Sequence, residues 1–370
     1  MGQVTAHSAD RLAGCLLGGA VGDALGANVE FDSAVVIRRR LGPQGVTGYV
    51  PGAWPVGAVT DDTQMTLFTA EGLLRARGLA KGIVHVPTMI WLSYLRWLHT
   101  QGERWPDVTR LHPVAARDGW LVAEPALHAS RAPGVTVMTA LRSGRMGTAA
   151  EPANDSKGCG GVMRVAPLAL ASEPFRTAVD AAALTHGHPS GYLAAGFLAE
   201  AIARLLRGAG LPAAVDAATD ELRRHPGHEE VLAAVGAARR LAAAGLPSPE
   251  AIAGLGAGWV AEEALGIALA CALAAPDFRS GVLAAVNHDG DSDSTGSIAG
   301  NLLGAVLGRS AVPAEWVAGL VEGPIVERVA ADLAAAFIDD RDRAGLDASY
   351  RAGDLSPSSD PSEAGVAWPA

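Results

Sequence analysis

Two runs of glycine, each repeating every four residues, constrain the fold of this chain more than any other feature. One run consists of Gly14, Gly18 and Gly22, and the other of Gly296, Gly300, Gly304 and Gly308. Because four residues make about one helical turn, each run places its glycines along one face of a helix. Glycine costs about 1 kcal/mol relative to alanine inside a helix, so a repeated run indicates that another backbone approaches that face closely. The sequence therefore predicts two tightly packed central helices.

The rest of the chain also reads mainly as helix. Of the 370 residues, 49% are hydrophobic but only 5% are aromatic, so Ala, Leu, Val and Gly must fill most of the core. Apolar residues recur at helical spacing in four further segments, residues 195–206, 231–241, 262–273 and 325–337. Strand patterns are limited to residues 35–37 and 46–50, which allow at most a small hairpin or a lid.

Residues 113–145 are irregular, with scattered Pro and Gly, and are typical of a segment that borders a cleft.

The C-terminal composition suggests where the domain ends. From Asp339 onward, Asp, Arg, Ser and Pro accumulate. We therefore expect one helical domain over residues 1–340 and a disordered tail over residues 341–370.

Charge and cysteine content exclude several classes of protein. The formal net charge is −10, and Lys81 and Lys157 are the two lysines, so a nucleic-acid backbone is not an expected partner. The three cysteines, Cys15, Cys159 and Cys271, have neither disulfide-framework nor zinc-cluster spacing, which fits a cytoplasmic protein. No apolar run reaches the roughly 18 residues of a membrane-spanning helix.

Two acidic clusters are the strongest candidates for a functional site. One is Thr60-Asp61-Asp62, the other is Asp291-Ser292-Asp293-Ser294, and each directly precedes a helical pattern. Either cluster alone could be a helix N-cap, but a cap needs one such residue rather than several. Clustered carboxylates repel one another unless a cation intervenes, and oxygen ligands suit Mg²⁺ or Mn²⁺. Together the clusters indicate a metal site.

Three other features are weaker candidates. Residues 154–164 form a polar, glycine-rich loop whose free backbone N–H groups could hold a diphosphate, although such a loop is often only a turn. His186 and His188 have the His-x-His spacing of some zinc sites, but they interrupt helical segments, and that context argues against zinc. Glu30 follows the first glycine run. If the two glycine helices pack together, Glu30 lies near the acids and could accept a proton from water.

Five segments, in this order, resemble motifs of the ADP-ribosylglycohydrolase family, which includes the dinitrogenase reductase-activating glycohydrolase. They are residues 18–26 (GGAVGDALG), 60–63 (TDDT), 163–167 (MRVAP), 185–186 (TH) and 290–294 (GDSDS). The resemblance covers roughly residues 11–309. It implies an all-α, compact single-domain helical bundle that encloses two Mg²⁺ or Mn²⁺ ions.

The resemblance also implies roles for individual residues. Six oxygen-bearing residues would hold the two ions, namely Thr60, Asp61, Asp62, Asp291, Asp293 and Ser294, the last standing where many relatives have Thr. Glu30 would lie over the metal centre near the substrate ribose. The substrate contacts on the diphosphate and adenosine side would come from Ser156, Lys157, Gly158, Gly160 and His186. Cys159 stands where relatives often have Asn.

The implied activity is hydrolysis of the glycosidic bond between ADP-ribose and an acceptor, which releases free ADP-ribose. Asp61, Asp62 and Glu30 are the candidate catalytic acids, and either Asp62 or Glu30 would orient or deprotonate the water. Two alternatives remain open: a catalytically inactive ADP-ribose-binding relative, and a divalent-metal nucleotide phosphohydrolase. The acceptor, the oligomeric state and the choice between Mg²⁺ and Mn²⁺ are not readable from the sequence.

Overall fold

The structure of the chain is a computed structural model that describes residues 6–78, 85–111, 118–339 and 349–350. The α-helices are α1 (Ala6–Gly26), α2 (Ala34–Leu41), α3 (Asp61–Gly78), α4 (Val86–Thr100), α5 (Trp105–Leu111), α6 (Trp120–Ala123), α7 (Val135–Arg142), α8 (Pro174–Ala183), α9 (Pro189–Leu206), α10 (Leu211–Leu222), α11 (Glu229–Ala242), α12 (Pro249–Ile252), α13 (Ala261–Ala274), α14 (Phe278–Val286), α15 (Ser292–Leu307), α16 (Ala314–Gly319) and α17 (Gly323–Phe337). The 3-10 helices are η1 (Pro125–Leu127), η2 (Cys159–Gly161), η3 (Ala166–Leu170), η4 (Ala253–Leu255) and η5 (Arg309–Ala311).

The predicted all-α fold is confirmed. These ranges contain no β-strand, and their one isolated bridge joins Gly158 to Val260. The four further helices predicted from apolar spacing are present as α9, α11, α13 and α17.

The predicted strands at residues 35–37 and 46–50 are wrong. Residues 35–37 belong to α2, which begins after Ser33, whose side chain accepts the N–H of Val36 at 3.3 Å. Ala34 and Ile37, three residues apart, are buried, whereas Val35 is 58% exposed, so the segment buries one helical face. Residues 46–50 are loop, and the backbone N–H and C=O of Val46 bond to the Asn287 side chain rather than to a strand partner.

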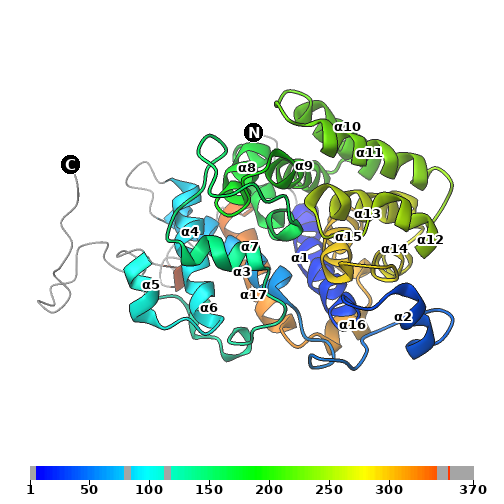
Figure 1. Cartoon of the computed structure of the whole chain (residues 1–370), viewed down its shortest axis with the longest axis horizontal. Coiled ribbons are helices and arrows are strands. Elements are labelled where there is room, and N and C mark those ends of the chain that lie inside the picture. Colours follow the sequence, from blue (N-terminus) through cyan, green and yellow to red (C-terminus); the bar gives the residue numbers. More distant parts are fainter. Residues whose placement is uncertain (1–5, 79–84, 112–117, 340–348, 351–370) are drawn as a thin grey trace, which may run out of the picture.

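The glycine runs form the central contact of the fold. Helices α1 and α15 lie side by side in the middle of the molecule (Figure 1). A Cβ atom built on Gly18 would be 2.4 Å from the carbonyl oxygen of Gly300, and one on Gly22 would be 2.0 Å from that of Gly296. A Cβ on Gly14 would be 2.5 Å from the carbonyl oxygen of Gly304. Residue numbers rise along one helix as they fall along the other, so the pair is antiparallel and the predicted close approach is confirmed.

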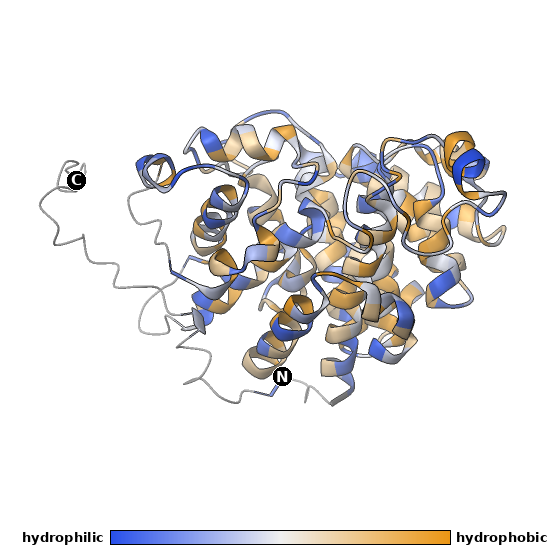
Figure 2. Ribbon diagram, turned by 90° about the horizontal axis from the view of Figure 1, so that it is seen from below, coloured by the Kyte–Doolittle hydropathy of each residue, from blue (hydrophilic) through white to orange (hydrophobic). Residues whose placement is uncertain are grey.

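The remaining helices form a shell around this pair. Helices α9, α13 and α14 pack against α15, and α3, α9, α14 and α17 pack against α1. Helices α10 and α11 lie at the outer edge of the molecule (Figure 1). Hydrophobic residues concentrate on the central helices, whereas hydrophilic ones lie on the outer helices and loops (Figure 2). The long helices therefore hold the ends of α1, α3 and α15 rigidly in one place.

Two predicted features fall wholly or partly outside the described residues. The predicted tail over residues 341–370 lies outside them except for residues 349 and 350, so the tail and the domain boundary at residue 340 stay predictions. In the irregular stretch over residues 113–145, residues 113–117 are also outside, and the remainder contains α6, η1 and α7. Among the helices that the structure describes, none is long and apolar enough to cross a membrane.

Candidate metal centre

Acidic residues from both ends of the domain meet where α1 ends and α15 begins. A Cβ atom built on Gly26, the last residue of α1, would lie 2.4 Å from the backbone nitrogen of Asp293. Glu30 lies four residues beyond Gly26, and one carboxylate oxygen from each of Glu30, Asp291 and Asp293 lies within 4.8 Å of the other two. The antiparallel glycine contact therefore places Glu30 beside the second acidic cluster.

The first acidic cluster reaches the same point from the start of α3. The negative charge of Asp293 acts on both Asp61 and Asp62 and raises the pKa of each carboxyl. One oxygen of Asp61 accepts the backbone N–H of Gly134 at 3.2 Å. In Asp62, Oδ1 is buried and has no hydrogen-bond partner. The two clusters therefore form one acidic centre at the N-termini of α3 and α15, where the helix dipoles favour negative charge.

Asp23, in the last turns of α1, fixes the first cluster. Its carboxylate accepts the backbone N–H groups of Thr60 at 2.9 Å and Thr63 at 3.0 Å. It also accepts the hydroxyls of Thr60 at 2.9 Å and Thr63 at 2.5 Å. Asp23 therefore caps α3 from another helix, a role that sequence spacing did not reveal. The one signal for it is a carboxylate inside a glycine-rich apolar run.

Electrostatics indicate that the centre needs a positive charge. Burial, followed by the charge of Asp293, raises the pKa of Asp23 to about 7. The same two causes raise the pKa of Glu30 to about 10, and they hold the pKa values of Asp61, Asp62 and Asp291 well above their usual range. Carboxylates in this arrangement cannot all be ionised at neutral pH without a compensating cation.

The donor set fits a hard divalent cation. Glu30 Oε2 and Asp62 Oδ1 are buried oxygens without a hydrogen-bond partner, although the great majority of such atoms in proteins have one. The surrounding donors are carboxylates and the hydroxyls of Thr60 and Ser294, and oxygen ligands are what Mg²⁺ and Mn²⁺ prefer. A cation bound here would give Asp62 Oδ1 a partner and relieve the mutual repulsion, and a water beside it would give Glu30 Oε2 one.

Two sulfur atoms border the centre on the side of α15. The Ser294 hydroxyl lies 3.6 Å from Cys159 Sγ and 3.8 Å from Met163 Sδ. Cys159 Sγ lies 2.7 Å from Asp291 Oδ2. Cys159 is half-buried and opens η2, so it brings the glycine-rich loop against the acidic centre.

The glycine-rich loop lies between the acidic centre and His186. The Ser156 hydroxyl bonds to the Thr136 hydroxyl at 3.0 Å and accepts the N–H of Gly158 at 3.3 Å. A Cβ atom on Gly160 would be 3.1 Å from the His186 ring, so side chains there would collide with the histidine. Burial, and then the Arg164 charge, lowers the pKa of His186 to about 3, which keeps its ring neutral. The structure therefore brings Ser156, Gly158, Gly160 and His186 together, and their role in substrate binding stays a prediction.

Lys157 is ion-paired on the outer side of this loop. Its ammonium group bonds to Glu230 Oε2 at 2.8 Å and to Glu262. The hydrogen bond that Lys157 donates to Glu230, followed by the one that it donates to Glu262, raises the pKa of Lys157 to about 12. The lysine charge therefore faces two carboxylates in this structure, and a diphosphate would have to compete with them for it.

An aromatic pair covers the surface next to the centre. The rings of Phe31 and Trp259 are stacked with centroids 5.8 Å apart, although these side chains are 74% and 43% exposed. Phe31 directly follows Glu30, and the carbonyl of Trp259 accepts the N–H of Cys159 at 3.1 Å. The pair therefore joins the segment after α1 to the glycine-rich loop. No pattern in the sequence predicted the contact between these two rings.

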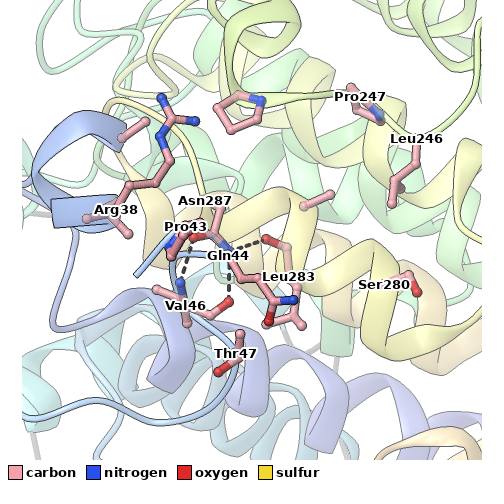
Figure 3. A pocket seen from close by; sticks show the side chains of 14 residues that line it. Arg38, Pro43, Gln44, Val46, Thr47, Leu246, Pro247, Ser280, Leu283 and Asn287 are labelled. Atoms are coloured by element: carbon pink, nitrogen blue, oxygen red, sulfur yellow. Dashed lines mark hydrogen bonds between the residues drawn. The ribbon is translucent and has the colours of Figure 1, made fainter. Parts of the chain in front are cut away.

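A pocket of about 380 Å³ lies elsewhere, between α2, the loop at residues 43–47 and α14 (Figure 3). Its lining contains one charged residue, Arg38, whose guanidinium pairs with Glu250 at 3.0 Å. Asn287 at its floor is already bonded to Val46 and to Leu283 O (Figure 3). With no carboxylate in its lining, this pocket does not match the chemistry of the acidic centre.

Comparison with known proteins identifies the family of the chain. The family model described as ADP-ribosylglycohydrolase matches residues 5–343. The chain belongs to the ADP-ribosylglycohydrolase family. The resemblance inferred from the five sequence motifs is thereby confirmed, and with it the prediction that the protein is a hydrolase of this class.

Individual relatives match along most of their length. ADP-ribosyl-[dinitrogen reductase] glycohydrolase of Rhodospirillum rubrum is 29% identical over 346 residues, which cover 89% of this chain and 98% of the relative. ADP-ribosylarginine hydrolase Tri1 of Pseudomonas putida is 26% identical over 334 residues, or 88% of this chain and 78% of the relative. A solved structure described as an ADP-ribosylglycohydrolase-related protein complex shares the fold with a TM-score of 0.60 and 30% identity, covering 89% of this chain and 98% of that one.

Proposed function

We propose that this ADP-ribosylglycohydrolase family member cleaves the glycosidic bond between ADP-ribose and its acceptor with the help of two divalent cations, Mg²⁺ or Mn²⁺. The residues that would hold the cations are Thr60, Asp61, Asp62, Asp291, Asp293 and Ser294. The observation that carries the proposal is the convergence of these side chains with Glu30, which leaves two buried carboxylate oxygens without partners. When bound, the cations supply positive charge and Lewis acidity at the ribose hydroxyls.

The chain's own residues would orient the substrate. Gly158 and Gly160 would present the backbone of this loop to the diphosphate, and the N–H of Gly158 would exchange its bond to the Ser156 hydroxyl for a phosphate oxygen. Ser156 would offer a hydroxyl on the same loop, and the His186 ring packs against Gly158 and Gly160. Lys157 would exchange its contact with Glu230 for the diphosphate, since Glu230 is the more exposed of its two partners.

Glu30 is the residue we propose to hold the attacking water. Its Oε2 is buried and lacks a hydrogen-bond partner, so it can accept a hydrogen bond from water. Neighbouring carboxylates stabilise the positive charge that develops on the ribose in the transition state. Asp62, which is more deeply buried at the start of α3, would serve the cations instead.

Two variants separate these roles. Asp62→Asn should lose metal binding and turnover together, whereas Glu30→Gln should lose turnover but bind Mn²⁺ with nearly unchanged affinity in a calorimetric titration. Asp220→Asn is a matched surface control, because that carboxylate is 70% exposed and pairs only with Arg223 among the described residues. Full turnover in Glu30→Gln would assign the water to another residue.

The reaction is tested with defined substrates. The protein would be incubated with ADP-ribosyl-arginine, ADP-ribosyl-serine and ADP-ribose in the presence of Mg²⁺ or Mn²⁺. The arginine in the name of one relative makes ADP-ribosyl-arginine the first choice. Release of free ADP-ribose supports the proposal. AMP release from ADP-ribose would indicate a phosphohydrolase, and binding without any product would indicate an inactive ADP-ribose-binding protein.

We also propose that the substrate is an ADP-ribosylated protein or small molecule.

We further propose a cytoplasmic location, because Cys15, Cys159 and Cys271 are free thiols, as expected in a reducing compartment. With net charge −10, the protein is not suited to bind a nucleic-acid backbone. Fractionation followed by immunoblotting tests the location.

A further inference from the structure

The thiol of Cys159 faces the acidic centre rather than the protein core. Its Sγ lies 2.7 Å from Asp291 Oδ2, and the Ser294 hydroxyl donates toward it at 3.6 Å. The backbone holds it in this position, because its N–H bonds to the carbonyl of Trp259 at 3.1 Å. Cys15 and Cys271 differ from it, since both are completely buried in the core.

Cys159 also lies close to the other half of the centre. Burial raises the pKa of its thiol first, and the charges of Asp291 and then Asp62 raise it further. Asp62 is 2% exposed, and its Oδ1 has no hydrogen-bond partner. Asp291, which Cys159 Sγ contacts, also belongs to the group in which one oxygen each of Glu30, Asp291 and Asp293 lie within 4.8 Å of one another, and Glu30 Oε2 is buried without a hydrogen-bond partner. A sulfur atom and an unpartnered buried carboxylate oxygen, which come from different segments of the chain, therefore adjoin the same aspartate.

We propose that Cys159 adds a sulfur ligand to the acidic centre, so that the centre also binds a thiophilic divalent cation such as Cd²⁺ or Zn²⁺ through Cys159 Sγ and Asp291 Oδ2. Thiolate sulfur is a strong ligand for Zn²⁺ and similar soft ions and a poor one for Mg²⁺. As the metal–sulfur bond forms, the S–H bond breaks and its proton passes to the buffer, with no change of oxidation state. The inference rests on the metal centre of the proposed function but not on the reaction itself.

The consequence is competition between two kinds of cation for one centre. A Cd²⁺ or Zn²⁺ ion bound through Cys159 would occupy the ligand Asp291 that Mg²⁺ or Mn²⁺ needs. Thiophilic cations therefore inhibit this protein, and the sulfur of Cys159 determines how strongly they do so.

Cadmium alone is the probe, because a sulfur–cadmium bond gives an ultraviolet charge-transfer band that does not depend on catalysis. Metal-free protein is titrated with Cd²⁺, and the wild type is compared with Cys159→Ser, with Asp291→Asn and with Cys271→Ala. The last variant removes a thiol outside the centre. We expect a saturable band in the wild type and in Cys271→Ala, no band in Cys159→Ser, and a Cd²⁺ affinity at least about tenfold lower in both Cys159→Ser and Asp291→Asn.

Excess Mn²⁺ should abolish the wild-type band if both cations use the same centre. The inference is overturned if the wild type shows no band at stoichiometric Cd²⁺, if the band survives in Cys159→Ser, or if Mn²⁺ leaves it unchanged. Circular dichroism of each variant confirms that it is folded. A band without hydrolysis of any ADP-ribosyl substrate would uphold this inference and refute the proposed function, whereas hydrolysis without a band would do the reverse.

Discussion

Replacing Gly300 with alanine is a direct test of the contact between α1 and α15. A Cβ atom at this position would lie 2.0 Å from the carbonyl oxygen of Gly18 and 2.5 Å from its carbonyl carbon. Normal contact distances are about 3.5 Å, so the two backbones would have to separate by more than about 1 Å. Neither atom belongs to a side chain that could rotate away. The strain therefore acts on the helix pair as a whole.

The expected change in stability has a sign opposite to that of an ordinary glycine-to-alanine change. In an unobstructed helix, alanine would stabilise the protein by about 1 kcal/mol. Overpacking in a core typically costs about 1–3 kcal/mol. A clash with a helix backbone, which cannot rotate away, should cost as much as the upper end of this range or more. We therefore expect Gly300→Ala to lower the free energy of unfolding by about 2 kcal/mol or more.

Gly266→Ala in α13 is the matched control, because its Cβ atom would meet the Ala234 side chain at 3.6 Å, an ordinary contact. We expect that variant to be stabilised by up to about 1 kcal/mol. Thermal and urea unfolding give the free energy of unfolding of both variants, and a calorimetric titration gives their affinity for Mn²⁺. Gly300→Ala should also bind Mn²⁺ more weakly, because the helix contact sets the position of Asp291 and Asp293 relative to Asp23, which holds the first acidic cluster. Equal stability of the two variants would refute the reasoning.

Three further predictions concern the acidic centre and its surroundings. Asp23→Asn removes the carboxylate that caps α3, so we expect calorimetry to show Mn²⁺ affinity about 10–100-fold lower without loss of a proposed ligand; unchanged affinity would contradict this role. Because the pKa values of Asp23 and Glu30 are raised to about 7 and about 10, the metal-free folded protein keeps protons that the unfolded chain releases near pH 4. Its free energy of unfolding should fall by up to about 1.4 kcal/mol per pH unit for each retained proton as pH rises from about 5 to 8, and its melting temperature should fall with it. Saturating Mn²⁺ should flatten this pH profile, and a flat profile for the metal-free protein would contradict the prediction. Trp259→Ala breaks the stack with Phe31 and should raise KM by up to about tenfold with little change in kcat, whereas Leu246→Ala, an exposed side chain at the separate pocket, should leave both unchanged in a steady-state assay.

The sequence predicted the central helix pair because glycine spacing reports one helical face directly. It could not give the register, since nothing in the two runs says that Gly18 meets Gly300 rather than Gly304. The sequence also could not show which partner each segment packs against, and this explains the wrong strand at residues 35–37. Val35 and Val36 are β-branched, but whether they are buried depends on what packs against α2, and both are exposed there.

The proposed ligands were recognisable because several carboxylates in three or four residues are unusual. Their support was not recognisable. Asp23 acts on Thr60 and Thr63 through contacts between helices, and Cys159 reaches Asp291 across 132 positions of the chain. Such pairings depend on tertiary packing, which a single sequence does not encode in any local pattern.

The glycine contact also determines when this protein can finish folding. Helix α1 is synthesised well before α15, so the glycine face of α1 has no partner until the growing chain includes Leu307. Contacts of such large sequence separation form slowly. Docking α15 also brings Asp291 and Asp293 against Glu30, so in this last step the carboxyl groups either keep protons or bind a cation. Divalent cations should therefore speed the closure of the chain's two ends, which makes them assembly factors as well as the centre's proposed reactive ions.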